Sequence, residues 1–304
     1  MNWQPMVEFG VYAALGLVSF ILWWLIYEWV LTREHSIREA IFGHNPNPAV
    51  ALDIFGGFLA MGILNHSVIS GPTLASFWLD LEATALTLLG TMVLLALLRW
   101  LIGEFLRLWF GQQRDSHGHL ITINNELFRQ RNLATGLFST GLYLILVAGL
   151  LEEDLLNITG NRMAASFNML GVWLLGLLTV LLHSWLYLGL GSKQHILHES
   201  FHENNPSAPL SLLGLLGGVI ILNHQLLADL PDQAHMFNQI EHWYFLVLGM
   251  VSVFVLRAVL HLLLWGLLRV SIRHELLVKR NHAWGILDGG LIFSLFLILI
   301  ALIA

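Results

Sequence analysis

The sequence predicts an all-α protein that crosses a membrane eight times. Of its 304 residues, 57% are hydrophobic and only 11% are charged, a balance far more apolar than that of soluble domains. Crossing a hydrocarbon layer of about 30 Å takes about 20 apolar residues as a helix, and the chain offers eight such stretches. Runs such as Leu86–Leu98 lack the alternation of membrane β-strands, which favours helices.

The expected spans form four pairs, each pair making a two-helix unit. The second span of each unit is rich in glycine and other small residues, which let helices pack closely in lipid, so these four spans are predicted to form the inner bundle. The first spans are richer in Trp and Leu and suit contact with lipid. In chain order, the spans cover 8–31, 49–69, 82–106, 133–151, 163–190, 208–228, 242–268 and 283–303.

A repeated motif marks the start of each inner span. A Glu is followed six residues later by an Asn, and an Asn at a helix start accepts hydrogen bonds from the free amides of the first turn. In the first unit, the insertion Asn45-Pro46-Asn47-Pro48 provides a second candidate, Asn47. The motif residues are Glu39 with Asn45, Glu126 with Asn132, Glu199 with Asn205, and Glu275 with Asn281.

Two interpretations of the motif remain open. In the first, each Asn caps a helix and the preceding Glu steadies it. In the second, the four Glu carboxylates and four Asn amides converge around a fourfold arrangement at the mouth of the bundle and form a cation site or gate.

Further similarities group the units into two halves. Asn65-His66 follows Asn47, and Asn223-His224 follows Asn205, both at a distance of 18 residues. The second and fourth units lack that dipeptide at the equivalent position, 18 residues after their motif Asn. We expect two tandem four-helix domains, 1–157 and 158–304, each containing two of the two-helix units.

Charge placement predicts the orientation. Lys and Arg collect in cytoplasmic loops, and here all but one of the cations outside the spans lie at the same end, with Arg162 alone at the other. This places the basic end in the cytoplasm and both termini outside. The cations at the basic end are Arg33, Arg38, Arg107, Arg114, Arg129, Arg131, Lys193, Arg269, Arg273, Lys279 and Arg280.

Four charged residues stand out inside the spans: Asp53, Arg99, Arg257 and Asp288. With a rise of about 1.5 Å per residue, the two Asp lie about 10 Å inward from the Asn of their own units. An unpaired ion at that depth is costly, so we predict the pairs Asp53–Arg99 and Asp288–Arg257, one in each half. Such pairs either hold the helices together or titrate along a permeation route.

His66 and His224 occupy equivalent positions, about 27 Å along their helices. Neutral imidazole binds zinc and other metals, so a shared metal or an axial haem ligand competes with plain hydrogen bonding at the membrane surface. His198 and His202 form the one loop pair with the spacing of a helical metal site. With no supporting cluster around His66 and His224, we expect no metal and no other cofactor.

The motif at Glu126, Asn132 and Ala134, repeated at Glu275, Asn281 and Ala283, resembles the signature of the bacterial inner-membrane family called domain of unknown function 350. The units at Asn47-Pro48-Ala49 and Asn205-Pro206-Ser207 depart from it through their prolines. The resemblance covers nearly the whole chain, as two four-helix domains in tandem. It implies a role in envelope maintenance beside phage-shock-protein-A-like membrane-stress proteins and polyamine-related enzymes.

The sequence lacks a nucleotide-binding glycine loop, a catalytic triad and a zinc-hydrolase motif, and it contains no cysteine. We therefore expect neither an enzyme nor a nucleic-acid partner. A channel or transporter in envelope homeostasis is the favoured function, and a membrane scaffold that recruits cytoplasmic proteins is the alternative. The expected partners are the lipid bilayer, further copies of the chain and a cytoplasmic membrane-stress protein.

Overall fold

The computed structural model describes residues 4–70, 76–114, 118–151, 162–185, 196–228, 236–271 and 273–303. These parts are helical, with a single isolated bridge between Arg114 and Leu120. The long helices are α1 (Gln4–Ile26), α3 (Pro48–Ser70), α4 (Phe77–Phe110), α5 (Leu133–Leu150), α7 (Arg162–His183), α8 (Ser207–Ala228), α9 (Met236–Leu268) and α10 (His282–Ile303). The short ones are η1 (Tyr27–Leu31), α2 (Ile37–Phe42), η2 (Asn125–Arg129), η4 (His198–His202) and η5 (His274–Val278).

Seven helices in the described residues are long and apolar enough to cross a membrane. They correspond to seven of the eight expected spans. The eighth expected span, 163–190, coincides in part with α7, whose apolar portion in the described residues is the shorter stretch Met169–His183. Residues 186–190 of that span lie outside the described residues.

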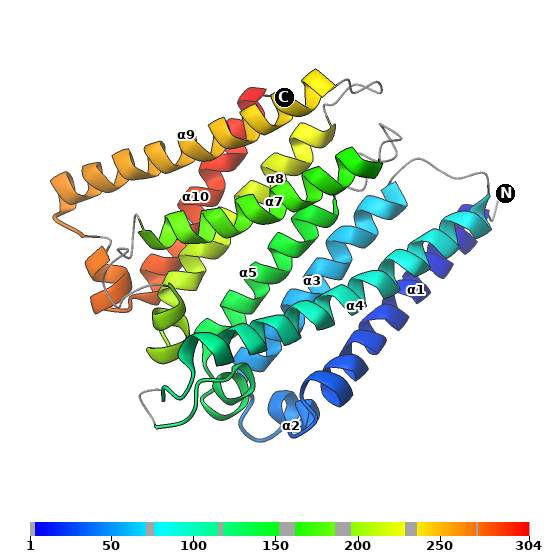
Figure 1. The fold of residues 1–304 in the computed structure, drawn as a ribbon, viewed down its shortest axis with the longest axis horizontal. Helices are drawn as coiled ribbons and strands as arrows, with labels where there is room; N and C mark the ends of the chain where they lie inside the picture. Colours follow the sequence, from blue (N-terminus) through cyan, green and yellow to red (C-terminus); the bar gives the residue numbers. More distant parts are fainter. Residues whose placement is uncertain are drawn as a thin grey trace.

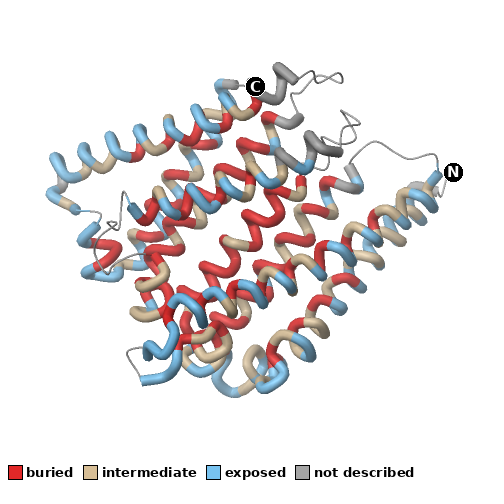
Figure 2. The backbone as a smooth tube through the Cα atoms, viewed as in Figure 1, coloured by how far each residue is buried: buried red, intermediate tan, exposed pale blue. Residues whose placement is uncertain are grey.

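The helices form two layers. The inner layer is a row in which α3 packs on α5, α5 on α8, and α8 on α10 (Figure 1). Helices α4, α7 and α9 lie across this row, and α1 flanks it beside α3. Burial is concentrated in the middle of the row, on α5 and α8, whereas α10 at its end is far more exposed (Figure 2). The small-residue helices thus form the inner layer.

Small residues set the closest helix contacts, and they do so at matching places in the two halves. A Cβ atom added to Gly136 of α5 would lie 2.5 Å from the carbonyl oxygen of Ala49 on α3. A Cβ atom added to Gly285 of α10 would lie 2.6 Å from the carbonyl oxygen of Ser207 on α8. Both glycines stand four residues after the motif Asn, so α3 with α5 and α8 with α10 pack in the same register.

Candidate functional site

The first candidate site surrounds Asp53 on α3, which is fully buried. Arg99 Nε from α4 donates a 2.9 Å hydrogen bond to Asp53 Oδ2. The Tyr143 hydroxyl from α5 donates to Oδ1 at 3.0 Å, and the Tyr27 hydroxyl donates to Oδ2. Arg99 Nη2 also donates to Asn124 Oδ1 at 3.0 Å. These five residues, the Asp53 centre, join several segments of the chain around one neutralised charge.

The second candidate site, the Asp288 centre, surrounds Asp288 on α10. Arg257 from α9 donates through Nε to Oδ1 at 3.1 Å and through Nη2 to Oδ2. The Ser211 hydroxyl from α8 accepts a 2.9 Å bond from Arg257 Nη2 and donates to Asp288. His261 Nε2 lies 3.0 Å from Asp288 Oδ1, and His183 Nδ1 lies 3.1 Å from Arg257 Nη1. Because a guanidinium only donates, His183 Nδ1 accepts and carries no proton.

Both ion pairs expected from the sequence are therefore present, one in each half. Their acids and bases are almost completely shielded from the surroundings. A buried charge is tolerated only when its partner and further hydrogen bonds compensate for lost hydration, and both centres meet that requirement. Whether either pair titrates or only holds helices together stays a prediction.

The Glu and Asn of the motif are hydrogen-bonded in three of the four units. The Asn side-chain Nδ2 donates to the Glu Oε2 at 2.8 to 2.9 Å, and the Asn Oδ1 accepts an amide of the first helical turn at 3.1 to 3.2 Å. Each Asn thus caps its helix while the Glu fixes the amide orientation. The three pairs are Glu126 with Asn132, Glu199 with Asn205, and Glu275 with Asn281.

In the first unit the structure decides between the two candidate caps, Asn45 and Asn47. Its cap is Asn47, whose Oδ1 accepts the backbone N–H groups of Ala49 at 3.1 Å and Val50 at 3.4 Å. Asn45 is exposed, and within the described residues no hydrogen bond joins it to Glu39. The insertion of two residues moves the capping position beyond Asn45, so the six-residue spacing is misleading here.

The motifs also link each unit to the next. Asn47 Nδ2 donates to the carbonyl of Leu127 at 2.8 Å, Asn132 Nδ2 to that of Ser200 at 2.7 Å, and Asn205 Nδ2 to that of Leu276 at 2.7 Å. Each acceptor comes directly after the motif Glu of the next unit.

The motifs lie along the row of inner helices and do not surround a common centre. The second interpretation, a fourfold constellation of Glu and Asn at the mouth of the bundle, does not describe this structure, because the helices pack in a row. Capping and joining neighbouring units are what the motif residues do in this structure.

The motif glutamates differ in their electrostatic surroundings at this end of the bundle. Burial raises the pKa of Glu199, although the Asn205 hydrogen bond opposes that effect. Hydrogen bonds from Asn281 and from Lys279, whose Nζ lies 2.6 Å from Oε1, lower the pKa of Glu275. The ionised form of Glu199 thus destabilises the folded state, whereas the ionised form of Glu275 stabilises it.

His66 and His224 are both exposed near the far ends of α3 and α8. Within the described residues, the cluster with metal-ligand spacing is instead His198, His202 and Glu203, whose ligand atoms lie within 4.8 Å of one another. Glu203 already forms an ion pair with the guanidinium of Arg280, and that cation would repel a metal ion. The cluster is better described as an ion-pair network.

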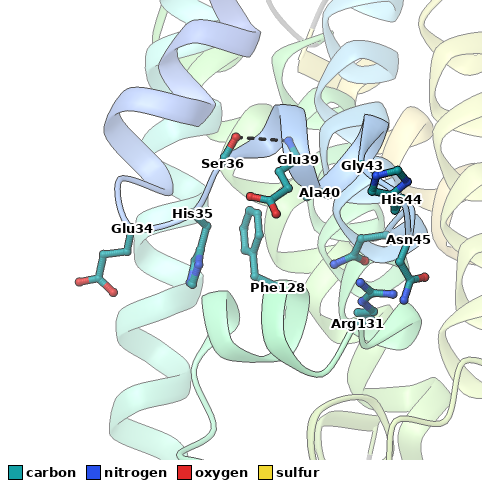
Figure 3. Close-up of a pocket in the computed structure, with 11 residues that line it drawn as sticks. Glu34, His35, Ser36, Glu39, Ala40, Gly43, His44, Asn45, Phe128 and Arg131 are labelled. Carbon is teal, nitrogen blue, oxygen red and sulfur yellow. Dashed lines mark hydrogen bonds between the residues drawn. The ribbon is translucent and has the colours of Figure 1, made fainter.

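A surface pocket of about 520 Å³ opens at the basic end between α2 and η2. Figure 3 shows its side chains coming from the first unit and from Phe128 and Arg131 of the second. The His35 ring stacks on Phe128, with centroids 4.6 Å apart. The pocket was not predicted from the sequence, although the insertion at 45–48 was the signal that this corner differs from its counterparts.

Comparison with protein families gives the same two-part division of the chain. The model of the family described as Domain of Unknown Function (DUF350) matches residues 1–152 and again residues 160–303. The chain belongs to the DUF350 family. It carries two tandem copies of the DUF350 domain, while the boundary expected at 157/158 stays a prediction because residues 152–161 lie outside the described parts. No curated protein and no solved structure matches the chain.

Corresponding positions of the two DUF350 copies explain how the centres are related. Arg99 and Arg257 lie 158 residues apart, as do Asp53 and Ser211 and the caps Asn47 and Asn205. Asp288 lies 149 residues after Ser139, the same separation as Asn132 and Asn281. The arginine thus keeps its place, whereas the Asp and the Ser have exchanged helices. Ser139 is fully buried, and within the described residues its hydroxyl has no hydrogen-bond partner.

Proposed function

We propose that this DUF350 protein is a bacterial inner-membrane transporter or channel that moves protons or small cations in envelope homeostasis, with the Asp288 centre as its working site. The observation that carries the proposal is the continuous polar chain from His183 through Arg257 and Asp288 to His261, held between membrane helices by contacts of 3.0 to 3.1 Å. Ionisable residues inside membranes commonly mark ion or proton pathways.

The chemistry of this row of polar side chains, from His183 to His261, suits reversible proton uptake. An imidazole can both donate and accept a proton, and His261 is the member most open to its surroundings, with 14% of its side chain exposed. A proton on His261 would create a second cation beside Asp288 and compete with Arg257 for the carboxylate. The Arg257–Asp288 pair could then separate while the protonated His261 still neutralised the charge of Asp288. The Asp53 centre uses two tyrosines in place of histidines and serves as its static counterpart.

The proposal includes eight spans arranged as four two-helix units, with the basic end in the cytoplasm and both termini in the periplasm. The matching packing of α3 with α5 and of α8 with α10 supports the repeat, and the clustering of cations at one end supports the orientation. Helix α7 would be the eighth span. Labelling of single cysteines placed near Ser36 and near Ser76 by an impermeant reagent tests the orientation, because only the second should react from outside.

Flux measurements on the purified protein in sealed vesicles test the function. Gradients of protons, monovalent cations and polyamines should be applied one at a time, with empty vesicles as control. Flux of at least one of these ions supports the proposal, and absence of flux under every gradient refutes it. Catalysis forms no part of the proposal.

A scaffold for a cytoplasmic membrane-stress protein is the second candidate, favoured by the pocket at the basic end. Its wall carries Glu34, Glu39, His44 and Arg131, which could bind charged side chains of a protein partner. This role predicts binding of a purified phage-shock-protein-A-like protein to the vesicle-embedded chain. The exchange Arg131→Glu should weaken that binding and leave the fold intact.

A further inference from the structure

The joint between the two DUF350 copies shows how one copy packs against another. Gly141 of α5 faces α8, where a Cβ atom added to the glycine would lie 3.0 Å from Leu216 and 3.5 Å from Leu213. Phe138, one turn earlier, packs its ring edge-on against Phe201 of η4 at a centroid distance of 5.4 Å. Helix α5 of the first copy thus presents a glycine-containing face that the second copy covers.

The corresponding face at the end of the second copy is uncovered. Gly290 of α10 corresponds to Gly141, and a Cβ atom added to it would meet nothing within 4 Å. Leu287 corresponds to Phe138 and is 48% exposed. The face that α5 buries against the next DUF350 copy is therefore present on α10 without a neighbour in the described residues.

The complementary surface is uncovered at the beginning of the first copy. Phe55 and Phe58 of α3 correspond to Leu213 and Leu216, the residues that receive Gly141. Phe55 is 52% exposed, and Phe58 is only partly buried. The two open surfaces are thus the two sides of the joint that the chain already makes once internally.

The flanking helix repeats the pattern. Gly176 of α7 packs on α5, and a Cβ atom added to it would lie 2.6 Å from Ile145 Cγ2. Its counterpart on α1 is Gly16, 160 residues earlier, the separation that also relates His35 to His195. Among the described residues, a Cβ atom on Gly16 would meet nothing within 4 Å, and Ser294, the counterpart of Ile145, is exposed on α10.

The motif asparagines agree with this pattern. Asn47, Asn132 and Asn205 are at least 97% buried, and each donates to a carbonyl of the following unit. Asn281, the last in the row, is only partly buried. Its side-chain amide donates to Glu275 and retains a second N–H, the hydrogen that its counterparts use for the next unit.

We propose that molecules of this protein join head to tail in the membrane, with α10 of one copy packing on α3 and α1 of the next. The contact reproduces the internal joint between the two DUF350 domains, so it is heterologous, and repetition of it gives a ring or an open row. In lipid, where hydrophobicity alone does not drive association, close packing of small residues against larger ones provides the attraction. The inference requires only the two tandem domains and is independent of any transport activity.

Disulfide crosslinking tests the proposal directly, because the natural chain has no cysteine. Gly16→Cys and Ser294→Cys are predicted to meet across the joint, as Gly176 and Ile145 do inside the chain. Membranes carrying the double variant should give a ladder of dimers and larger products on oxidation, and co-expressed single variants should give a mixed dimer. Each single variant alone should give little product, since a heterologous joint never brings two copies of one position together.

Gly266→Cys combined with Gly16→Cys provides the control for random collisions. Gly266 lies on α9 outside the proposed joint, and a Cβ atom there also meets nothing within 4 Å. We expect the Gly16/Ser294 pair to give about tenfold more crosslinked product than this control, the population ratio that corresponds to about 1.4 kcal/mol. Equal yields, or a dimer formed mainly by one single variant, would overturn the proposal.

Gly290→Leu separates assembly from folding. The larger side chain enters open space in the isolated chain, so the monomer should fold and insert as before, while the joint should close no longer. Adding Gly290→Leu to the crosslinking pair should abolish the ladder, whereas Gly266→Leu should leave it unchanged. A ladder that survives Gly290→Leu would show that α10 does not form the joint.

Discussion

The two halves of the chain predict that the Asp53 centre can be broken and then repaired from a neighbouring helix. Asp53→Ser removes the carboxylate that accepts hydrogen bonds from Arg99, Tyr27 and Tyr143. Arg99, 3% exposed, is then left as an unpaired buried cation. Ser139→Asp would restore a carboxylate at the position that Asp288 occupies in the second half.

The structure sets the size of the effect. Removing one partner of a buried ion pair costs about 3–5 kcal/mol, because the other charge stays buried without compensation. Asp53→Ser should fall in this range, since serine can satisfy no more than a fraction of the three donors. Ser139→Asp alone should also destabilise the fold, because it places two carboxylates beside one guanidinium. The double variant should recover more than half of the loss caused by Asp53→Ser.

The assay is the free energy of unfolding in mixed micelles, measured by titration with a denaturing detergent for the natural chain, both single variants and the double variant. The four values form a double-mutant cycle, and the coupling free energy should be large and favourable. If the effects of the two exchanges are additive, a carboxylate at position 139 cannot replace the one at position 53, and the proposed equivalence of the two centres is refuted. A stable, natively folded Asp53→Ser protein would refute the pairing argument itself.

Three further predictions concern the motif and the packing. Glu199→Gln should remove a loss of stability that occurs as pH rises through the elevated pKa of Glu199. Glu275→Gln should remove a loss that occurs as pH falls through the lowered pKa of Glu275, so melting temperatures from about pH 2 to about pH 8 distinguish the two, and unchanged pH profiles would contradict both. Asn132→Ala should cost about 1–2 kcal/mol as a lost cap, with a lower melting temperature and no change in helix content; an unchanged melting temperature would contradict the capping role. Gly214→Val would drive a side chain into the backbone of Gly289 and should prevent folding, so recovery of monodisperse protein in gel filtration would contradict the packing described.

The two ion pairs were predictable from the sequence because an unpaired charge is costly inside a membrane. Each half has one Asp and one Arg that needed a partner inside the membrane, so Asp53 was paired with Arg99 and Asp288 with Arg257. Their polar neighbours were not predictable, because the choice of Tyr27, Tyr143 or His261 as donor depends on how each helix is rotated about its axis. A uniformly apolar sequence does not fix that rotation.

The motif shows a second limit of sequence reasoning. The six-residue spacing alone identified the caps at Asn132, Asn205 and Asn281. In the first unit that spacing indicated Asn45, whereas the second candidate, Asn47, is the cap. The spacing also left open whether four repeated units close around an axis or form a row. That outcome depends on contacts between units, such as the bond from Asn132 to the Ser200 carbonyl, which no local pattern encodes.

Flux into sealed vesicles of the cation that the natural protein transports, compared between the natural protein and Asp288→Asn, tests the central claim most directly. The exchange keeps the size of the side chain and removes its charge from the polar chain that runs from His183 to His261. Ser294→Ala, on the exposed face of α10, serves as the matched control. We predict flux for the natural protein and for the control and its loss in Asp288→Asn. Equal flux in all three, or none in the natural protein, would contradict a working role for the Asp288 centre.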